Sequence, residues 1–415
     1  MRIAIVGTGI SGLVAANKLS RDHLVTVFES ADRIGGHTAT KDVMVEGRSY
    51  AIDTGFIVFN DRTYPEFIKI MDSMGVRSQP TTMGFSVSCE RSGLEYSGRN
   101  LNSLFAQRKN LLSPYFLSLV RDILRFNRQA LYHFENDQLD PEQTLDQYLY
   151  QHNYGTAFVR HYLAPMAAAI WSSSQQAVLD FPVLFFVRFF KNHGLLQIRD
   201  RPQWRTLIGG SNSYLEPMSR PFQQQIRLSC PVRHIKRNES SVTVASGRFG
   251  EEEFDHVVIA AHADEALSLL ADPSQAEQEI LGTIPYRKNS VVLHTDTRVL
   301  PERRSTWSSW NYRITAVAQE LPVLSYNMNI LQRIESEHTF SVTLNHDQAI
   351  DQNKVLGRYE YAHPEFSADA VAAQERWPDI NGANTWYCGA YWRNGFHEDG
   401  VSSALRVVKH LSNGG

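Results

Sequence analysis

Three glycines and one glutamate near the start of the chain have the types and spacing that bind a dinucleotide. Gly7, Gly9 and Gly12 form a G-x-G-x-x-G loop, and Glu29 follows at the usual distance of the acid that hydrogen-bonds a ribose hydroxyl. The first glycine permits a tight turn, the second lets the backbone approach a pyrophosphate, and the third lets a helix pack closely on a strand. These residues predict a phosphate-binding loop, and they leave NAD and FAD open.

The elements around this loop have the pattern needed to position it. The apolar run 3–6 indicates a strand buried on both faces, and residues 11–19 are expected to form a helix. A second apolar run, 24–28, ends at Glu29 and predicts the next strand. The amides at the start of the helix would then point toward the anion.

The residues after Glu29 extend the motif. The stretch ADRIGGHTA, residues 31–39, has the form R-x-G-G-[HR]-T and resembles FAD enzymes of the amine oxidase and phytoene desaturase superfamily. The resemblance implies that Arg33, Gly35 and Gly36 lie against the diphosphate and ribityl chain of FAD. An NAD dehydrogenase does not need this extension, so we expect FAD as the cofactor.

The C-terminal stretch TWYCGAYWRNGFHEDGVSSALRVVKHL is a second motif. Residues 385–389 predict a strand, and a helix is expected to begin near Asp399 and Gly400, with an apolar face formed by Val401, Leu405, Val408 and Leu411. In the superfamily this element is the second cofactor-binding motif, whose helix amides point at the pyrimidine end of the flavin. Reduced flavin carries negative charge there, which the positive end of a helix stabilises. The alternative is a surface helix capped by Asp399.

Longer motifs narrow the resemblance. They look like the flavoprotein half of plant cyclopropane fatty acid synthases and bacterial stand-alone relatives, over roughly residues 1 to 411; the motifs are DTGFIVFNDRTYPEF, RRSTWSSWNY, LSYNMNILQ, YEYAHPEF and WYCGAYWRNGFHEDG. The resemblance implies a lipid substrate, namely a fatty acyl chain of a phospholipid. The chain has no room for the methyltransferase half, so an acyl-modifying methyltransferase is the expected pathway partner.

The two motifs and the segments expected beside them supply the candidate cofactor-binding residues. The nucleotide loop and the strand after it contribute Gly7, Gly9, Ile10, Ser11, Gly12, Glu29 and Ser30. The next segments contribute Arg33, Gly35, Gly36, His37, Thr38, Gly55 and Phe56. The later segments contribute Val232, Ala260, Ala261, Gly389, Glu398, Asp399, Gly400 and Val401.

His363, Tyr361 and His397 are the candidate catalytic residues. A flavin that removes a hydride from carbon often needs a side chain to take the accompanying proton, and His or Tyr can serve. YEYAHPEF occupies the position where relatives place flavin-facing residues, and His397 lies inside the closing motif. Each of the three could instead be a hydrogen-bonded structural residue. Trp171 and Ser172 are expected either to line a substrate cavity or to end a packed helix.

The composition limits the class of protein. A chain of 415 residues with 42% hydrophobic residues suits two domains with sizeable cores, and a net charge of −3 gives no electrostatic case for nucleic acid. Cys89, Cys230 and Cys388 are widely separated, so neither a disulfide framework nor a metal site is expected. Cys388 lies inside the closing strand, away from the position where related oxidases attach flavin, so FAD is expected to be noncovalent.

The chain shows no signal peptide before its first strand and no apolar run of the length that a membrane span needs. We therefore expect a cytoplasmic protein that is at most peripheral to a membrane. The stretch VLDFPVLFFVRFFKNHGLL, residues 178–196, leaves two interpretations open. It could form a tunnel wall or a bilayer-facing surface with Arg188 and Lys191 at the headgroups. A packed core helix is the favoured alternative, because apolar stripes at helical spacing usually serve packing.

The predicted architecture is α/β with two discontinuous domains. A Rossmann-like FAD-binding domain, a three-layer fold with a parallel sheet and an antiparallel meander, is expected from residues 1–79, 205–288 and 376–415. An α+β substrate domain of the amine oxidase type is expected from residues 80–204, mainly helical, and 289–375.

Three further local elements are predicted between the motifs. Residues 51–59 are apolar and indicate one strand. The stretch TYPEFIKIMDSMGV indicates a helix closed by Gly75, and Asp140 followed by Pro141 predicts the start of a helix that continues through Tyr150.

These observations predict an FAD-dependent oxidoreductase that oxidises or desaturates a lipid acyl chain by hydride transfer to flavin N5. An amine oxidase or a carotenoid-type desaturase of the same superfamily is one alternative. A non-catalytic lipid-binding escort of the Rab GDP-dissociation inhibitor type is another. Glu29, the extension from Arg33 to Gly36 and the closing motif argue against the escort, because a prenyl-binding escort needs none of them.

Overall fold

A five-stranded parallel sheet forms one half of the molecule. The computed structural model describes residues 1–197, 200–317 and 319–413 of the chain. The strand order is β10-β2-β1-β14-β20, and the strands are Ile226–Arg227, Leu24–Phe28, Arg2–Val6, His256–Ile259 and Thr385–Tyr387. All four pairings are parallel. Strands from the start, middle and end of the chain therefore share one sheet, and the predicted α/β class is confirmed.

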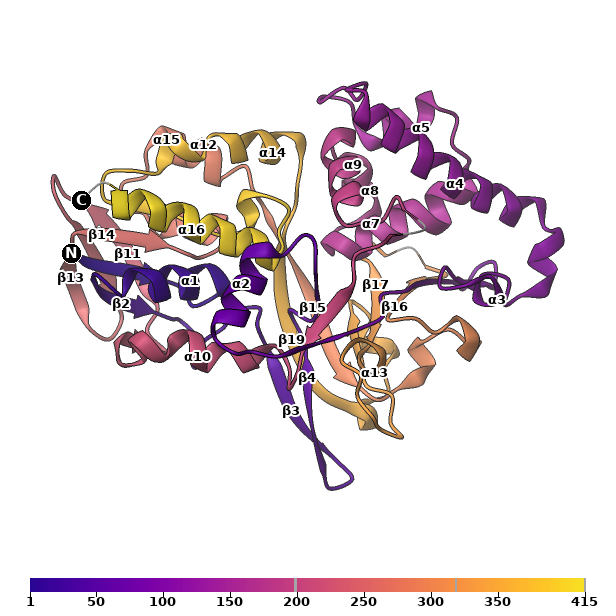
Figure 1. Cartoon of the computed structure of the whole chain (residues 1–415), viewed down its shortest axis with the longest axis horizontal. Helices are drawn as coiled ribbons and strands as arrows, with labels where there is room; N and C mark the ends of the chain where they lie inside the picture. Colours follow the sequence, from indigo (N-terminus) through magenta and orange to yellow (C-terminus); the bar gives the residue numbers. More distant parts are fainter. Residues whose placement is uncertain (198–199, 318, 414–415) are drawn as a thin grey trace.

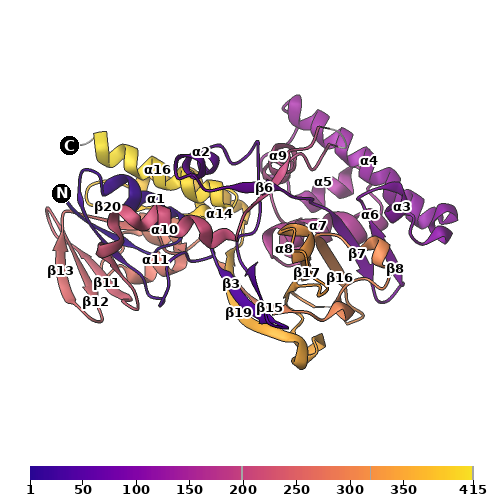
Figure 2. The same ribbon diagram turned by 60° about the horizontal axis from the view of Figure 1, so that its bottom comes forward.

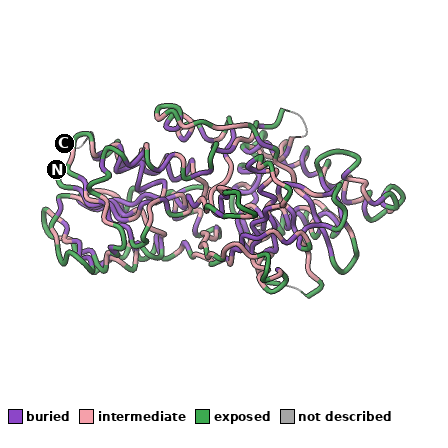
Figure 3. Tube along the Cα trace, turned by 90° about the horizontal axis from the view of Figure 1, so that it is seen from below, coloured by how far each residue is buried: buried purple, intermediate pink, exposed green. Residues whose placement is uncertain are grey.

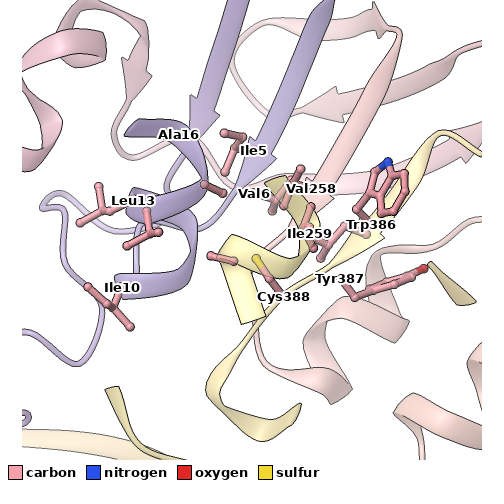
Figure 4. Packing of buried hydrophobic residues seen from close by; sticks show 14 of the residues in the cluster. Ile5, Val6, Ile10, Leu13, Ala16, Val258, Ile259, Trp386, Tyr387 and Cys388 are labelled. Carbon is pink, nitrogen blue, oxygen red and sulfur yellow. The ribbon is translucent and has the colours of Figure 1, made fainter. Parts of the chain in front are cut away.

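Helices α1 (Ile10–Leu19) and α16 (His397–Asn413) lie side by side on this sheet (Figure 1). The apolar side chains of the central strands pack beneath them (Figure 4). Ile5, Val258 and Tyr387 have no solvent exposure, as expected for parallel strands covered on both faces. The cofactor motifs at both ends of the sequence are thereby fixed to the same sheet.

An antiparallel meander lies in the same half. It consists of β11 (Val232–Arg237), β12 (Val242–Ser246) and β13 (Gly250–Phe254), in that order. Short helices complete this half of the molecule: α2 (Pro65–Ser73), α10 (Leu215–Ser219), α11 (Ala263–Leu269), α12 (Gln275–Leu281), α14 (Ala368–Glu375) and α15 (Trp377–Ile380).

The other half is built on a seven-stranded mixed sheet in the order β19-β15-β18-β17-β16-β7-β8. Its strands are Val355–Pro364, Tyr286–His294, Ser341–Leu344, Val323–Asn327, Trp310–Ile314, Phe85–Cys89 and Leu94–Ser97. The pairing of β16 with β7 is parallel and the other pairings are antiparallel. Short strands link the halves: β3 (Thr40–Val45), β4 (Arg48–Asp53), β5 (Phe59–Asn60), β6 (Ser78–Pro80) and β9 (Trp204–Leu207).

Helices gather at one end of the seven-stranded sheet (Figures 1 and 2). They are α3 (Leu101–Leu104), α4 (Pro114–Glu135), α5 (Leu145–Gln151), α6 (Thr156–Phe158), α7 (Ala164–Trp171), α8 (Gln175–Leu179) and α9 (Val183–Asn192). Helix α13 (Met328–Leu331) follows β17. The predicted domain boundaries stay a prediction, and residues 198–199, 318 and 414–415 of the predicted domains lie outside the described residues.

Several local predictions need correction. Residues 51–59 do not form one strand, because β4 ends at Asp53 and β5 begins only at Phe59. The helix expected from Asp140 begins later, as α5, and Thr144 caps it by accepting a hydrogen bond from the backbone amide of Gln147. Residues 80–204 include the hairpin β7–β8 before the helices. The closing helix begins at His397, about one turn earlier than Gly400.

The phenylalanines of α9 lie in the core. Phe185, Phe186, Phe189 and Phe190 are all buried, whereas Arg188 is exposed. The packed-core alternative for this stretch is therefore confirmed, and these rings cannot rest on a bilayer. Figure 3 shows buried chain running through the interior of both halves and exposed loops at the periphery. Among the described residues, no helix has the length and apolarity that a membrane crossing requires.

Candidate cofactor site and active site

The nucleotide loop has backbone geometry that only glycine fits at two positions. Gly7 has a φ of +100°, and a Cβ there would lie 2.8 Å from the carbonyl oxygen of Ala260. A Cβ on Gly12 would lie 2.0 Å from the carbonyl oxygen of Gly7. A Cβ on Gly9, in contrast, would meet no atom within 4 Å. The first and third glycines are needed by the fold itself, and the second keeps a space open above the loop.

The open space at Gly9 fits a diphosphate. Gly9 is the N-cap of α1, no side chain caps it, and the first turn of α1 holds no acidic residue. The amides of that turn therefore remain for an anion, which the positive end of the helix favours. Gly400 lies beside the same turn, since a Cβ on it would be 2.8 Å from Ile10 Cγ2 and 2.8 Å from Ser11 Oγ. The backbone of Ala261 lies beside Gly7, since a Cβ on Gly7 would be 3.6 Å from the Ala261 nitrogen.

Glu29 is buried at the end of β2, beside the nucleotide loop. Its carboxylate accepts hydrogen bonds from the amides of Thr8, at 2.9 Å, and Ala31, at 2.8 Å. The hydroxyls of Thr8 and Ser30 also donate to it. A ribose hydroxyl would replace one of these two hydroxyls as a donor. The segment that leads to Val232 lies beside Glu29, because the amide of Cys230 donates to the carbonyl oxygen of Glu29 at 2.8 Å.

Arg33 organises the loop that follows β2. Its guanidinium donates to the carbonyl oxygens of Gly36, at 2.8 Å, and Thr38, at 3.0 Å. Gly35 has a φ of +114°, and its amide donates to the carbonyl oxygen of Thr8 at 3.1 Å. The loop is thereby held over the nucleotide loop. The direct contact of Arg33 with FAD stays a prediction.

Three of the predicted residues, His37, Tyr361 and His363, meet at one place although they are distant in sequence. The ring centroids of Tyr361 and His363 lie 5.3 Å and 5.6 Å from that of His37. His37 Nε2 donates to the carbonyl oxygen of Ala362, at 3.0 Å, which ties its loop to β19. His262, which the sequence analysis missed, lies 5.6 Å from His37 between ring centroids. Its position directly after Ala261 was the available signal.

Burial keeps these imidazoles uncharged. Desolvation lowers the pKa of His37 to about 4 and the pKa of His363 to about 3. It also lowers the pKa of His262. A neutral imidazole has a free nitrogen lone pair that can take a proton, although a low pKa weakens it as a base. The cluster therefore presents an uncharged surface at neutral pH.

His397 faces the same loop from the start of α16. Its ring stacks on Phe56, with centroids 3.5 Å apart and planes 10° apart. His397 Nε2 lies 3.1 Å from Thr38 Oγ1 and 3.2 Å from the hydroxyl of Tyr214. Burial lowers the pKa of His397 to about 3. Phe56 is itself fixed, because its amide donates to the carbonyl oxygen of His37 at 2.8 Å.

Polar neighbours orient the two candidates on β19. The hydroxyl of Tyr361 lies 2.8 Å from Thr54 Oγ1, and burial raises the pKa of Tyr361, so it stays protonated. His363 Nδ1 lies 3.3 Å from Asn289 Nδ2. Thr54 and Asn289, like Tyr214, escaped the sequence analysis, because no spacing along the chain links them to β19 or α16.

Gly55 allows the close approach of two loops. A Cβ on Gly55 would lie 2.1 Å from the carbonyl oxygen of His37. Gly389 is fixed at the other side of the site, where its amide donates to Ser403 Oγ at 3.1 Å. Val401 is fully buried in the core of the parallel sheet.

The acidic residues of the closing motif bind backbone groups of this chain. The carboxylate of Glu398 accepts the amides of Glu66, at 3.0 Å, and Phe67, at 2.9 Å, and so caps α2. The carboxylate of Asp399 accepts the amide of Phe396 at 2.9 Å. Burial raises the pKa of Asp399 to about 7. Glu398 therefore has a structural partner that the sequence analysis did not foresee.

Aromatic side chains extend from this site into the helical region. Phe396 precedes His397, and its ring centroid lies 5.1 Å from that of Phe189 on α9. The ring of Trp171 lies 4.7 Å from that of Phe189 and Trp171 is 4% exposed; its indole Nε1 is buried and has no hydrogen-bond partner among the residues that the structure describes. Ser172 follows in the left-handed conformation at the end of α7. We call Phe396, Phe189 and Trp171 the aromatic layer.

The described residues hold no cluster of three His, Cys, Asp or Glu side chains that could bind a metal ion. Cys388 is fully buried, and this burial raises the pKa of its thiol to about 12. A protonated, inaccessible thiol does not attack a flavin. This environment supports the expectation of noncovalent FAD.

Comparison with known proteins agrees with this geometry. Residues 10–329 match the family model described as flavin containing amine oxidoreductase. A protein named flavin-containing monoamine oxidase AofH, from Mycobacterium tuberculosis (strain H37Rv), is 23% identical over 283 residues, which cover 65% of this chain and 59% of that protein. The chain thus matches only about three fifths of the length of that relative.

Two solved structures share the fold over nearly the whole chain. Cyclohexylamine oxidase from Brevibacterium oxydans IH-35A has a TM-score of 0.70 at 16% identity, with coverage of 99% of both chains. A fatty acid isomerase from P. acnes, described as producing CLA, also has a TM-score of 0.70 at 16% identity, with coverage of 99% of this chain and 98% of that one. The family match confirms the expected cofactor, FAD. Because the family model matches more than half of its length, the chain belongs to the family of flavin-containing amine oxidoreductases.

Proposed function

We propose that this chain is an FAD-dependent oxidoreductase that oxidises or desaturates a fatty acyl chain of a phospholipid. The aromatic layer is the observation that supports a lipid as the class of substrate. It joins the closing cofactor motif to α7 and α9 through Phe396, Phe189 and Trp171, with ring centroids 5.1 Å and 4.7 Å apart. Buried aromatic side chains beside His397 would surround a hydrocarbon chain at a lower desolvation cost than a charged substrate.

The uncharged state of the neighbouring imidazoles supports the same choice. Burial lowers the pKa values of His37, His363 and His397 to about 3 or 4, so these three rings carry no positive charge near neutral pH. A saturated or monounsaturated acyl chain gives up a hydride and a proton when a new double bond forms. Bound FAD supplies the hydride acceptor, its N5 atom.

The residues of this chain have separate tasks in the proposal. The amides after Gly9 would hold the diphosphate of FAD, and the carboxylate of Glu29 would hold its ribose. His363 is the first candidate to accept the proton. The lone pair that would take it is on Nδ1, which Asn289 Nδ2 faces at 3.3 Å, so protonation there would replace the hydrogen bond from Asn289. Tyr361 stays protonated and hydrogen-bonds Thr54. Buried aromatic side chains exclude water from this region.

The comparisons support both this proposal and its rival. The fatty acid isomerase shares the fold, which favours a lipid, whereas cyclohexylamine oxidase and the mycobacterial relative favour an amine. The buried indole N–H of Trp171 has no partner in the described part of the chain, and it could donate to an ester carbonyl oxygen of a lipid. The indole N–H cannot accept a hydrogen bond from an ammonium group.

Anaerobic reduction of the bound flavin tests the substrate class. Purified protein, expected to be yellow, is mixed without oxygen with a dispersed monounsaturated phospholipid, or with cyclohexylamine, and the loss of flavin absorbance is followed. We expect the lipid to reduce the flavin and the amine to leave it oxidised. Reduction by the amine alone would establish the rival function. A flavin that neither compound reduces would overturn the lipid assignment.

A further inference from the structure

The segment between α3 and α4, together with the first turn of α4, exposes large apolar side chains next to basic ones. Leu112 is 87% exposed, Leu111 is 49% exposed and Tyr115 is 47% exposed. Arg108 and Lys109, which Asn110 separates from the two leucines, are also exposed. We call these five residues the leucine tip. Such a patch marks an interaction surface, because exposed apolar area in a cluster is costly in water.

Helix α4 continues this surface. Leu117, Arg121, Leu124 and Arg128 are all exposed, and their spacing places them on one side of the helix. The opposite side packs into the core through Phe116, Leu119, Phe126 and Ala130. The exposed stripe alternates leucine with arginine. This pattern is typical of a helix that lies on a membrane surface.

The exposed charges of residues 99–128 are all positive. Residues 99–128 contain six basic residues and one acidic residue, Asp122. Asp122 is 1% exposed and binds Arg121, Arg125 and the amide of Gly155, so it does not face solvent. Within the described residues, the other four basic side chains form no ion pair; they are Arg99, Arg108, Lys109 and Arg128. The partner that complements this surface is anionic.

A cavity of about 300 Å³ lies beside the leucine tip. Lys109 and Tyr115 line it, together with the polar side chains of Ser92, Gln107 and Ser113. A cationic group and several hydrogen-bonding groups suit a phosphate-bearing headgroup. The apolar leucines and the polar cavity therefore match the two layers of a phospholipid surface.

From this combination we propose that the leucine tip and the exposed stripe of α4 dock the protein onto an anionic phospholipid bilayer. Leu111 and Leu112 insert at the acyl boundary, and Arg108 and Lys109 bind the headgroup phosphates. This surface lies at the end of the molecule opposite the two chain termini (Figures 1 and 2). The biological purpose of this docking rests on the proposed lipid function. The docking surface itself follows from the exposed leucines and basic side chains described above.

Co-sedimentation with vesicles tests the docking. The FAD-loaded protein is mixed with vesicles of phosphatidylcholine containing phosphatidylglycerol, or of phosphatidylcholine alone. We expect binding to the anionic vesicles to exceed binding to the neutral ones, and to weaken at high salt. Arg108→Glu with Lys109→Glu, and separately Leu111→Ser with Leu112→Ser, should each lower the partition coefficient about tenfold or more.

Matched variants on other elements, away from the leucine tip, separate a local effect from a general one. Arg233→Glu with Lys236→Glu changes the net charge equally on the exposed face of β11. Met44→Ser removes an apolar side chain that is 65% exposed on β3. Both controls should sediment with anionic vesicles as the unmodified chain does. Flavin absorbance and the melting temperature identify any variant that is misfolded.

The possible outcomes separate the two proposals. Equal vesicle binding by the tip variants and the unmodified chain, or no binding by the unmodified chain, overturns the docking surface. A sedimentation coefficient that falls in the leucine variant without lipid would assign the tip to contact between copies of this chain, and would also overturn it. Reduction of the flavin by detergent-dispersed lipid should be the same in the tip variants. If the unmodified chain binds vesicles but detergent-dispersed lipid does not reduce its flavin, only the proposed lipid function is contradicted.

Discussion

The imidazole of His397 stacks face to face on the ring of Phe56, with centroids 3.5 Å apart. This contact joins the first residue of α16 to the loop after β4. Thr38 and Tyr214 hold His397 through its Nε2 atom at 3.1 Å and 3.2 Å. Both nucleotide motifs and the loop after β4 thus form one wall, and His37, Tyr361 and His363 continue it.

Replacement of His363 should affect chemistry more than cofactor binding. We expect His363→Ala to slow anaerobic flavin reduction by lipid about 100-fold, as is typical for loss of a positioned proton acceptor. Since the pKa of His363 is about 3, its ring stays neutral across mildly acidic and neutral pH, and its own titration should not lower the rate there. Stopped-flow reduction at several pH values measures both effects.

His133→Ala is the control for His363, because His133 is a half-buried imidazole on α4 that contacts Tyr148 of α5 and none of the residues of this wall that the structure describes. It should reduce its flavin at the unmodified rate, and both variants should retain FAD. If His363→Ala also keeps the unmodified rate, the residue is structural, and Tyr361→Phe and His397→Ala become the next variants to compare.

Two glycines of the same loop should respond differently to substitution. Gly9→Val places its side chain in open space, so the fold should survive while FAD affinity falls about tenfold or more. Gly12→Ala places a Cβ 2.0 Å from the Gly7 carbonyl oxygen, so the whole protein should be destabilised. Glu29→Ala should also lose the yellow colour. Flavin absorbance and apoprotein melting temperatures distinguish these cases. An unfolded Gly9→Val variant would contradict the open space at Gly9.

Glu398 provides a test of capping against cofactor binding. Because its carboxylate accepts the amides of Glu66 and Phe67, Glu398→Ala should lower the free energy of unfolding by about 1 to 2 kcal/mol. FAD affinity should stay close to that of the unmodified chain. Urea denaturation and flavin titration measure the two quantities. A variant that loses FAD without losing stability would restore Glu398 to the cofactor-binding residues.

The buried carboxyl of Asp399 should make stability depend on pH. Burial raises its pKa to about 7, above the value of about 3.9 in an unfolded chain. Between those values the folded state binds more protons, so the free energy of unfolding falls as pH rises from about 4 to about 7. Asp399→Asn cannot ionise, and its amide oxygen can still accept the Phe396 amide.

The melting temperature of the unmodified chain should therefore fall by several degrees relative to Asp399→Asn between about pH 5 and about pH 8. Thermal denaturation of both proteins in the same buffers measures this difference. Asp369→Asn, which changes an exposed carboxyl in the first turn of α14, should follow the unmodified profile. Parallel profiles for all three proteins would show that Asp399 does not titrate in this range.

Short-range patterns determined much of the fold. The spacing of Gly7, Gly9 and Gly12 specifies a backbone turn, and the apolar runs on either side specify β1 and β2, so these elements could be predicted from adjacent residues alone. The same reasoning failed for residues 51–59 because hydrophobic content alone does not reveal where β4 ends and the loop that holds Phe56 begins.

The active-site wall was decided by tertiary structure. His37, His262 and His363 belong to segments far apart in the chain, and only the packing of β19 and the nearby loops brings their rings within 5.6 Å of His37. The partner of Glu398 on α2 follows from the same packing. The amino-acid sequence by itself determined the FAD loop and the family, because those depend on local backbone geometry. Which polar side chains meet, and whether the aromatic face of α9 is covered, depended on the tertiary structure, because long-range packing sets burial and partners.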